Sequence, residues 1–181
     1  MIEPLEAWSR IQWQARRGGR VIWLSGEDGV ETASLVARSI SEWRSAGLRV
    51  LFADFSSMVD SESFERTLLL RLLGPHAQQA RATVSLWRRL AGVLAESGSD
   101  VRIILDRIES AGQPSRAVVS TIHHLVTCHR ATLLVASPRD DQSDSRILSA
   151  WADVEIGQIG QIGQIGQIGQ ITAGAPSRQV A

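Results

Sequence analysis

Short apolar runs alternate along the chain with longer stretches in which apolar residues recur every three or four positions. The short runs have the length of strands and are rich in β-branched and aromatic residues, which is typical of buried strands. They predict strands at 21–24, 49–55, 101–106, 132–136 and 154–156. The longer stretches predict amphipathic helices near 5–15, 31–46, 62–73, 80–96, 115–128 and 143–151. Strands separated by helices predict a parallel sheet covered on both faces, with ligands at the carboxyl ends of its strands.

The opening helix is predicted from apolar residues at three- and four-residue spacing. These residues are Leu5, Trp8, Ile11, Trp13 and Ala15. The pair Gly18-Gly19 follows them and ends the helix. The second helix has an apolar face as well and ends at Gly47, where we expect a glycine cap. Residues 1–20 are therefore predicted to form a lead-in helix before the main domain.

Residues 156–170 are five tandem Ile-Gly-Gln triplets, followed by a polar tail that contains proline. Glycine at every third position without regular proline is not the collagen pattern. A β-solenoid is one alternative, but so short a stretch could complete only about two or three rungs. We favour a simple-sequence expansion without a packed core. The expected organisation is a domain over 21–156 and a disordered repeat tail over 157–181.

Composition narrows the class of protein. At 181 residues the chain fits one domain, and 44% hydrophobic with 21% charged residues are ordinary for a globular protein. Its formal net charge is zero and it contains no lysine, so no overall field attracts nucleic acid or an anionic membrane. Cys128 is the single cysteine, which excludes an internal disulfide. The acidic start lacks the features of a signal peptide, and no apolar run approaches the ~18 residues of a membrane span, so we expect a cytoplasmic protein.

Residues 21–37 have the order strand, glycine turn and helix that is typical of a phosphate-binding loop. In a loop of the form G-x-x-x-x-G-K-[ST], backbone N–H groups hold the phosphates, the lysine reaches the β- and γ-phosphates, and the hydroxyl holds Mg²⁺. Aligned without gaps, Gly26 takes the first glycine position. Glu31, Thr32 and Ala33 then take the positions of the second glycine, the lysine and the hydroxyl. A shift by one residue places Thr32 on the hydroxyl position and Glu31 on the lysine position, so neither alignment supplies the cation.

Acidic residues flank the predicted start of this helix, where a triphosphate would need to sit. They are Glu27, Asp28 and Glu31. One carboxylate about 5 Å from a phosphate oxygen costs on the order of 3 kcal/mol at an effective dielectric of ~20. The same carboxylates suit the positive end of the helix and can accept hydrogen bonds from its free N–H groups. We therefore predict a helix that caps itself and needs no ligand.

Two later strands also end in polar residues. Residues 101–107, Val-Arg-Ile-Ile-Leu-Asp-Arg, resemble the second ATPase motif, in which an apolar strand ends in an aspartate for Mg²⁺ and a glutamate that activates water. Asp106 is kept, and Arg107 replaces the glutamate. Residues 132–137, Thr-Leu-Leu-Val-Ala-Ser, resemble the strand that ends in a polar sensor of the γ-phosphate, here Ser137.

In order and spacing, residues 5–156 resemble the AAA+ ATPases of the secretion- and transposition-associated bacterial type, whose loop reads Gly-Glu-x-Gly-x-Gly-Lys-Thr. The resemblance is carried by Gly26-Glu27, Gly29 and Asp106. It implies an α/β fold, a three-layer doubly wound parallel sheet of the P-loop NTPase kind, with the triplet repeat in place of the family's helical lid. It also implies a degenerate nucleotide site made of Gly26, Glu27, Asp28, Gly29, Glu31, Thr32, Ala33, Ser34, Asp106 and Ser137.

A second resemblance, to adenylylsulfate kinases, covers the first third of the chain. It rests on Val-Ile-Trp-Leu-Ser-Gly at 21–26, followed by Ala-Gly-Leu-Arg-Val at 46–50. The chain departs from these kinases at the same catalytic positions of the loop. This resemblance implies a small-molecule kinase as an alternative function.

A metal site is not predicted. His124 and Cys128 lie four residues apart on a predicted helix and could face one ion. A structural zinc site needs four convergent ligands, and the neighbouring His123 and His129 point elsewhere around the helix. The same Cys-His pair lacks a third group to orient it, so it does not predict a nucleophile.

Two further groups of residues are interpreted structurally. The acidic residues Asp140, Asp141 and Asp144 are predicted to form a solvated loop and a helix cap. Trp87 precedes Arg88-Arg89, a pattern that could stack a nucleic-acid base. With zero net charge, a core tryptophan and surface arginines are the interpretation we favour.

The lysine, the hydroxyl and the catalytic glutamate are lost together while the sheet pattern persists. This predicts a non-hydrolysing ATPase-like domain without catalytic residues, acting as a regulatory or protein-interaction module on an intact ATPase or a second copy. The alternative is a divergent ATPase or kinase in which Arg20, Arg107 or Arg139 replaces the lysine and ATP with Mg²⁺ is the ligand. A third interpretation is an α/β interaction module unrelated to ATPases, without a nucleotide site near Gly26.

Overall fold

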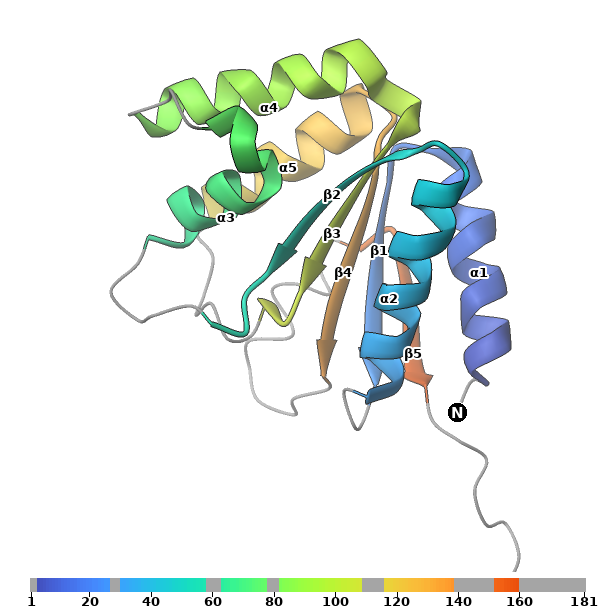
Figure 1. Cartoon of the computed structure of the whole chain (residues 1–181). Helices are drawn as coiled ribbons and strands as arrows, with labels where there is room; N and C mark the ends of the chain where they lie inside the picture. The colour runs from blue at the N-terminus through green and yellow to red at the C-terminus, as the bar shows by residue number, and fades with distance from the viewer. Residues whose placement is uncertain are drawn as a thin grey trace, which may run out of the picture.

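The computed structural model describes residues 3–26, 30–57, 63–77, 82–108, 116–138 and 152–159. Its centre is a five-stranded, fully parallel sheet in the order β2-β3-β4-β1-β5 (Figure 1). The strands are β1 (Arg20–Gly26), β2 (Arg49–Asp54), β3 (Val101–Asp106), β4 (Thr132–Pro138) and β5 (Val154–Ile159). All five predicted strands are confirmed. The last one continues to Ile159, so the first Ile-Gly-Gln triplet belongs to the sheet.

Five helices connect and cover these strands. They are α1 (Pro4–Arg17), α2 (Val30–Ser45), α3 (Phe64–Leu73), α4 (Thr83–Ser97) and α5 (Arg116–Cys128). Short 3₁₀ turns, η1 (Gly74–Ala77) and η2 (Gly98–Asp100), follow α3 and α4. The predicted helix at 143–151 lies outside the described residues, and so does most of the repeat tail, of which only 157–159 are described. Within the described part of the chain, no helix follows β5.

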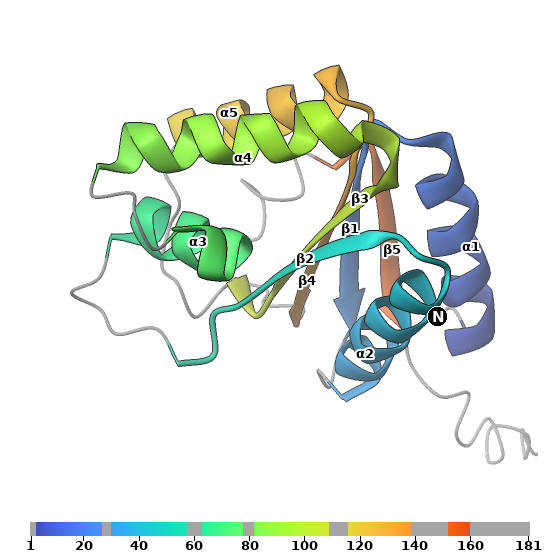
Figure 2. The same cartoon turned by 45° about the horizontal axis from the view of Figure 1, so that its top comes forward.

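The helices form two layers, one on each face of the sheet. Helices α1 and α2 lie on one face, and α3, α4 and α5 lie on the other (Figures 1 and 2). Side chains of the buried strands alternate between the two layers: Ile22 and Leu24 pack toward α1 and α2, whereas Val21 and Trp23 pack toward the other layer. The predicted three-layer α/β fold is confirmed.

The buried face of α1 differs from the predicted one. Leu5 and Trp13 are 65% and 55% exposed. The face that meets the sheet consists of Ala7, Trp8, Ile11 and Ala15. Residues that are two positions apart in a helix are rotated by about 200° around its axis, so Trp13 lies on the side opposite Ile11. The guanidinium of Arg17 covers the exposed ring of Trp13, 4.7 Å from its centroid.

A glycine turn carries the chain from α1 into β1. Gly18 has φ of +64°, and a Cβ atom there would lie 2.6 Å from the carbonyl oxygen of Arg130. The N–H of Gly19 donates to the carbonyl of Ala131 at 2.7 Å. Only glycine fits both the backbone conformation and this close approach. The predicted glycine stop of the opening helix is therefore confirmed.

Candidate functional site

The predicted site residues that the structure describes gather at the carboxyl ends of the strands. In the register of the sheet, Ser25 of β1 lies beside Ser137 of β4. Asp106 at the end of β3 lies between Ala136 of β4 and Asp54 of β2. Side chains from strands far apart in the sequence thus meet at one end of the sheet, because the carboxyl ends of parallel strands all lie on the same side.

The glycine turn itself is only partly described. Gly26 ends β1 and pairs with Pro138 of β4 and Ile159 of β5. Glu27, Asp28 and Gly29 lie outside the described residues. Helix α2 then begins at Val30, so the predicted strand and the predicted helix are present on the two sides of the gap.

The first turn of α2 contains the altered positions of the loop. Glu31 is half-buried, whereas Ala33 and Ser34 are exposed. Thr32, which takes the place of the lysine, is 3% exposed, and its Oγ1 has no hydrogen-bond partner among the described residues. The side chain at the lysine position is therefore short, buried and uncharged.

An internal ion-pair cluster lies at the ends of β2 and β3. The Nη2 atom of Arg107 lies 3.1 Å from Oδ2 of Asp54, and its Nε atom lies 3.7 Å from Oδ2 of Asp106. Arg107 adopts φ of +54°, and its backbone N–H donates to the carbonyl of Ala136 at 3.1 Å. The residue at the position of the catalytic glutamate thus turns back and places a guanidinium on two carboxylates.

The pKa values of the two carboxylates in this cluster are shifted in opposite directions. Burial raises the pKa of Asp106, and Asp54 adds to the rise, while the guanidinium of Arg107 opposes it. For Asp54, burial also favours a higher value, but the hydrogen bonds from Ser56 and the nearby Arg107 and Arg71 outweigh it and lower the pKa. The cluster therefore holds an ionised Asp54 beside a more easily protonated Asp106.

These residues do not fit ATP with Mg²⁺. A magnesium site needs oxygen ligands that are open to the ion, and the two carboxylates here face a guanidinium instead. Within the described ranges, no group of three or more His, Cys, Asp or Glu side chains could hold a metal ion. The buried Thr32 offers no cation for the phosphates.

The arginines considered as replacements for the lysine are placed differently. Arg20 starts β1 and lies 3.9 Å from Asp153. It is six residues before Gly26, roughly 20 Å away along the strand, which is beyond the reach of an arginine side chain. Arg107 is paired with the two aspartates, and Arg139 lies outside the described residues. Neither of the two described candidates, Arg20 and Arg107, therefore supplies the missing cation.

Asp54 was not predicted as a site residue. It ends β2, the strand at the edge of the sheet next to β3, and its carboxylate accepts from both the N–H and the Oγ of Ser56. An aspartate at the end of an apolar strand was a usable signal in the sequence. What the sequence could not supply was that β2 lies directly beside β3.

The structure places the Cys-His pair and Trp87, two features that the sequence analysis considered as possible sites. His124 and Cys128 contact each other at 3.5 Å on the exposed side of α5. The indole N–H of Trp87 donates to Glu65 of α3 at 2.6 Å, so this half-buried ring joins α3 to α4. Arg88 is exposed. The acidic residues at 140, 141 and 144 lie outside the described residues.

Comparisons with known proteins reveal a likeness in structure alone. No protein-family model matches the chain, and no curated protein matches its sequence significantly. The ORC2 protein of Aeropyrum pernix, in ADPNP–ADP complexes, is similar over 85% of this chain with a TM-score of 0.56 and 17% identity, across 46% of its own length. A DNA replication initiation factor gives a TM-score of 0.54 over 84% of this chain, with 14% identity and 45% of its own length. AMPPCP-bound DnaA from Aquifex aeolicus gives 0.50 over 83%, with 15% identity and 45% of its length.

The chain has the three-layer α/β fold of these structures, a fold similar to that of P-loop NTPases. It spans about half the length of each of these structures. At these identities the likeness concerns the fold, in which the glycine turn after β1 and the ends of β3 and β4 occupy one edge of the sheet. No helix within the described ranges is long and apolar enough to cross a membrane.

Proposed function

We propose that this chain is a non-hydrolysing AAA+-type domain that acts through protein contacts. The observation that carries the proposal is the guanidinium of Arg107 on Asp54 and Asp106. In an active site of this fold, Asp106 would be expected to face Mg²⁺ and its neighbour to activate water. Here the neighbour is a cation that neutralises the aspartates from within the protein.

Electrostatics support this proposal. A divalent ion at Asp106 would have to approach a guanidinium that already lies within 4 Å of both carboxylates. Glu31 lies in the first turn of α2, where the phosphates would bind, and repels them. The short, buried Thr32 that stands in place of the lysine supplies no charge to offset this repulsion.

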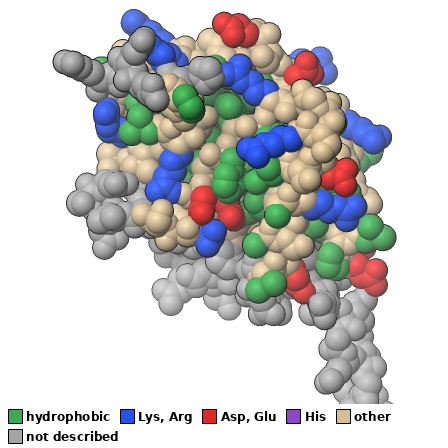
Figure 3. All heavy atoms as spheres, viewed as in Figure 1, with side chains coloured by type: hydrophobic (Ala, Val, Ile, Leu, Met, Phe, Trp, Pro, Cys, Tyr) green, Lys and Arg blue, Asp and Glu red, His purple; other side chains and the backbone are tan. Residues whose placement is uncertain are grey.

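Several features favour a protein as the partner. The formal net charge is zero, and on the face drawn in Figure 3 acidic and basic side chains are interspersed and form no basic stripe. Nucleic acid needs a local excess of positive charge. We propose an intact ATPase or a second copy of this chain as the partner, in the reducing cytoplasm.

The test is calorimetric titration with ATP and Mg²⁺ of the native chain and of a chain with the loop restored, Glu31→Gly/Thr32→Lys/Ala33→Thr. The native chain is expected to give no heat of binding, because it lacks the cation. The restored chain is expected to bind with a Kd in the micromolar range, on the order of 10 μM. Silence of both chains would remove the support for a degenerate phosphate loop.

A turnover assay tests the claim about hydrolysis separately. Purified native protein is expected to release no phosphate from ATP above the buffer rate. Adding Arg107→Glu to the restored loop is expected to allow Mg²⁺ to reach Asp106. Phosphate release by the native chain that disappears in Asp106→Ala would contradict the proposal.

A further inference from the structure

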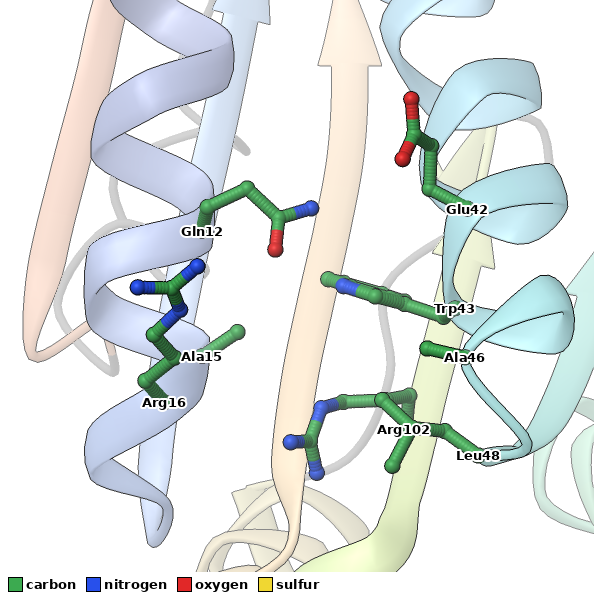
Figure 4. Close-up of a pocket in the computed structure, with 8 residues that line it drawn as sticks. All are labelled: Gln12, Ala15, Arg16, Glu42, Trp43, Ala46, Leu48 and Arg102. Atoms are coloured by element: carbon green, nitrogen blue, oxygen red, sulfur yellow. The ribbon is translucent and has the colours of Figure 1, made fainter.

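A pocket of about 300 Å³ lies at the opposite end of the molecule from the altered loop. It is bounded by the last turns of α1 and α2 and by the start of β3, four residues before Asp106. Four strand residues correspond to roughly 13 Å, so this pocket is separate from the ion-pair cluster. Its volume is at the lower end of the range for small-molecule sites. Figure 4 shows its residues on the facing sides of the two helices.

The base of the pocket holds a buried arginine. Arg102 is 7% exposed and occupies a position of β3 on the face toward α1 and α2, next to the apolar Ile104. Its Nη1 donates to the carbonyls of Ser99 and Val101. Its Nε is buried without a partner, and no carboxylate among the described residues lies within ion-pair distance of its guanidinium.

A buried guanidinium without an ion-pair partner lowers the stability of a protein that binds no ligand beside it. A buried charge is normally paired, and a buried unpaired donor costs about 1–3 kcal/mol. Burial lowers the pKa of Arg102, against a smaller effect of Asp100. An arginine is nevertheless charged at neutral pH. The guanidinium is therefore a cation on which Asp100 acts only from beyond ion-pair distance, in a place where an anion can enter.

The walls of the pocket define what kind of anion fits. The ring of Trp43 lies 6.0 Å from the guanidinium carbon of Arg102. In Figure 4 the Trp43 side chain points from α2 toward α1, and Gln12 points from α1 toward it. Leu48, Ala15 and Ala46 add apolar surface. Trp43 is only 2% exposed, so the apolar surface open to a ligand comes mainly from Leu48 and Ala46, and a small apolar body can lie there while its acidic group reaches the guanidinium.

Both signs of charge are present at the rim of the pocket. Arg16 adds a second guanidinium, but Glu42 adds a carboxylate on the facing helix. Glu42 lies 3.7 Å from Arg38, whose guanidinium offsets part of its negative charge. Two arginines and one carboxylate that is already paired leave the pocket with a net positive charge, so it attracts an anion. The planar guanidinium also matches the two oxygens of a carboxylate.

We propose that this pocket is a binding site for a small organic monocarboxylate with an apolar body, held by Arg102 and lying beside Trp43, Leu48 and Ala46. The site is separate from the altered loop, so it can bind its ligand whether or not the domain binds ATP. A ligand there contacts the last turns of α1 and α2 together and links them to the sheet.

Benzoate is the probe, and the readout is the indole N–H signals of the six tryptophans in the NMR spectrum of the full chain. The Trp43 signal, assigned with Trp43→Phe, is expected to shift saturably with a Kd on the order of 1 mM, as suits so small a ligand. Benzamide, which has the same shape without the charge, is expected to produce no saturable shift. Saturable shifts with benzamide, or none with benzoate, would overturn the proposal.

Variants then locate the site. Arg102→Gln is expected to weaken benzoate binding by at least about tenfold, because it removes the charge-assisted contacts. Arg49→Gln makes the same substitution in the neighbouring strand at the same end of the sheet and is expected to bind like the native chain. Equal affinities of the two variants would overturn the assignment.

A further variant and a second probe test the proposal when Arg102→Gln is uninformative. If Arg102→Gln does not fold, Ala46→Phe places a ring in the mouth of the pocket from an exposed helix end and is expected to abolish the shift. Retained binding in that variant would place benzoate elsewhere and contradict the proposal. Inorganic phosphate is expected to shift Trp43 less than benzoate does. An equal effect would contradict the role given to the apolar wall.

Discussion

Arg107 joins two carboxylates that are far apart in the sequence. Its guanidinium contacts Asp54 at the end of β2 and Asp106 at the end of β3. The side chain is half exposed, so the strength of each pair is limited by solvent. Its importance lies in position, because a protein cation occupies the place at which a metal ion would meet Asp106.

Arg107→Gln tests this electrostatic link. We expect the pKa values of both Asp54 and Asp106 to rise, because the guanidinium stabilises the charged form of each carboxylate. The measurement is a pH titration of the carboxyl carbon signals by NMR. Arg49→Gln, at the far end of β2, is the control and is expected to leave both values unchanged. Unchanged values in Arg107→Gln would contradict the ion-pair cluster.

Asp106 also predicts a pH dependence of stability. Its pKa in the folded protein is raised, first by burial, so the folded state binds more protons than the unfolded state between the ordinary and the raised value. The free energy of unfolding contributed by Asp106 therefore falls as pH rises through this window. Asp54, with its lowered pKa, contributes the opposite slope at pH below its ordinary value.

The substitution Asp106→Asn removes the contribution of Asp106 to the free energy of unfolding, which falls as pH rises. Relative to the native chain, we expect this variant to gain stability as pH rises from about 4 through the raised pKa of Asp106, and to hold a constant difference at higher pH. Urea unfolding at a series of pH values measures the difference. A difference that does not change with pH would show that Asp106 titrates at its ordinary value.

At the scale of elements, α1 shows how a helix chooses its buried face. Its residues Ala7, Trp8, Ile11 and Ala15 face the sheet, and two small alanines allow the helix to approach closely. Trp13 stays outside although it is the larger apolar residue. Geometry decides this, because a helix can bury only residues within one stripe of its surface.

A pair of truncations in α1 checks this orientation. Ile11→Ala is expected to lower the free energy of unfolding by about 2–5 kcal/mol, because Ile11 is fully buried. Leu5→Ala removes a similar volume from a residue that is 65% exposed and is expected to change stability by about 0.5 kcal/mol or less. Urea unfolding at neutral pH compares the two. Equal losses would contradict the observed rotation of the helix.

At the scale of the whole molecule, β5 completes the sheet next to β1. Its Ile156 is fully buried under the α1 and α2 layer, and Val154 packs beside it. Without β5, the backbone of β1 would become an open edge. The first Ile-Gly-Gln triplet is therefore part of the domain that supports the altered loop.

Two shortened chains isolate the contribution of β5. A chain ending after Ile159 keeps the strand, and a chain ending after Asp153 lacks it but keeps the contacts of Asp153 with Val21. We expect the shorter one to be less stable by about 3 kcal/mol or more, because it loses a fully buried isoleucine and a strand pairing. The measurement is the difference between their unfolding curves. Equal stability would contradict the placement of β5.

Much of this architecture was predictable from local pattern. The alternation of short apolar runs with helical periods predicted five strands and their helices, because period and length are properties of neighbouring residues. Strand ends were less certain: β4 continues to Pro138 and β5 to Ile159, since pairing partners extend them. The membership in the secretion- and transposition-associated type stays a prediction of the sequence.

By itself, the sequence determined the α/β class and the absence of a lysine cation, because these depend on local periodicity and chemical composition. Only the tertiary structure decided that Asp54 lies beside Asp106, with Arg107 bonded to a partner 53 residues away. It alone decided that Arg102 is buried at the base of a pocket and that Trp13 faces away from the core. The physical reason is that strand order and helix rotation bring distant residues together, and no repeating local pattern encodes which strands become neighbours.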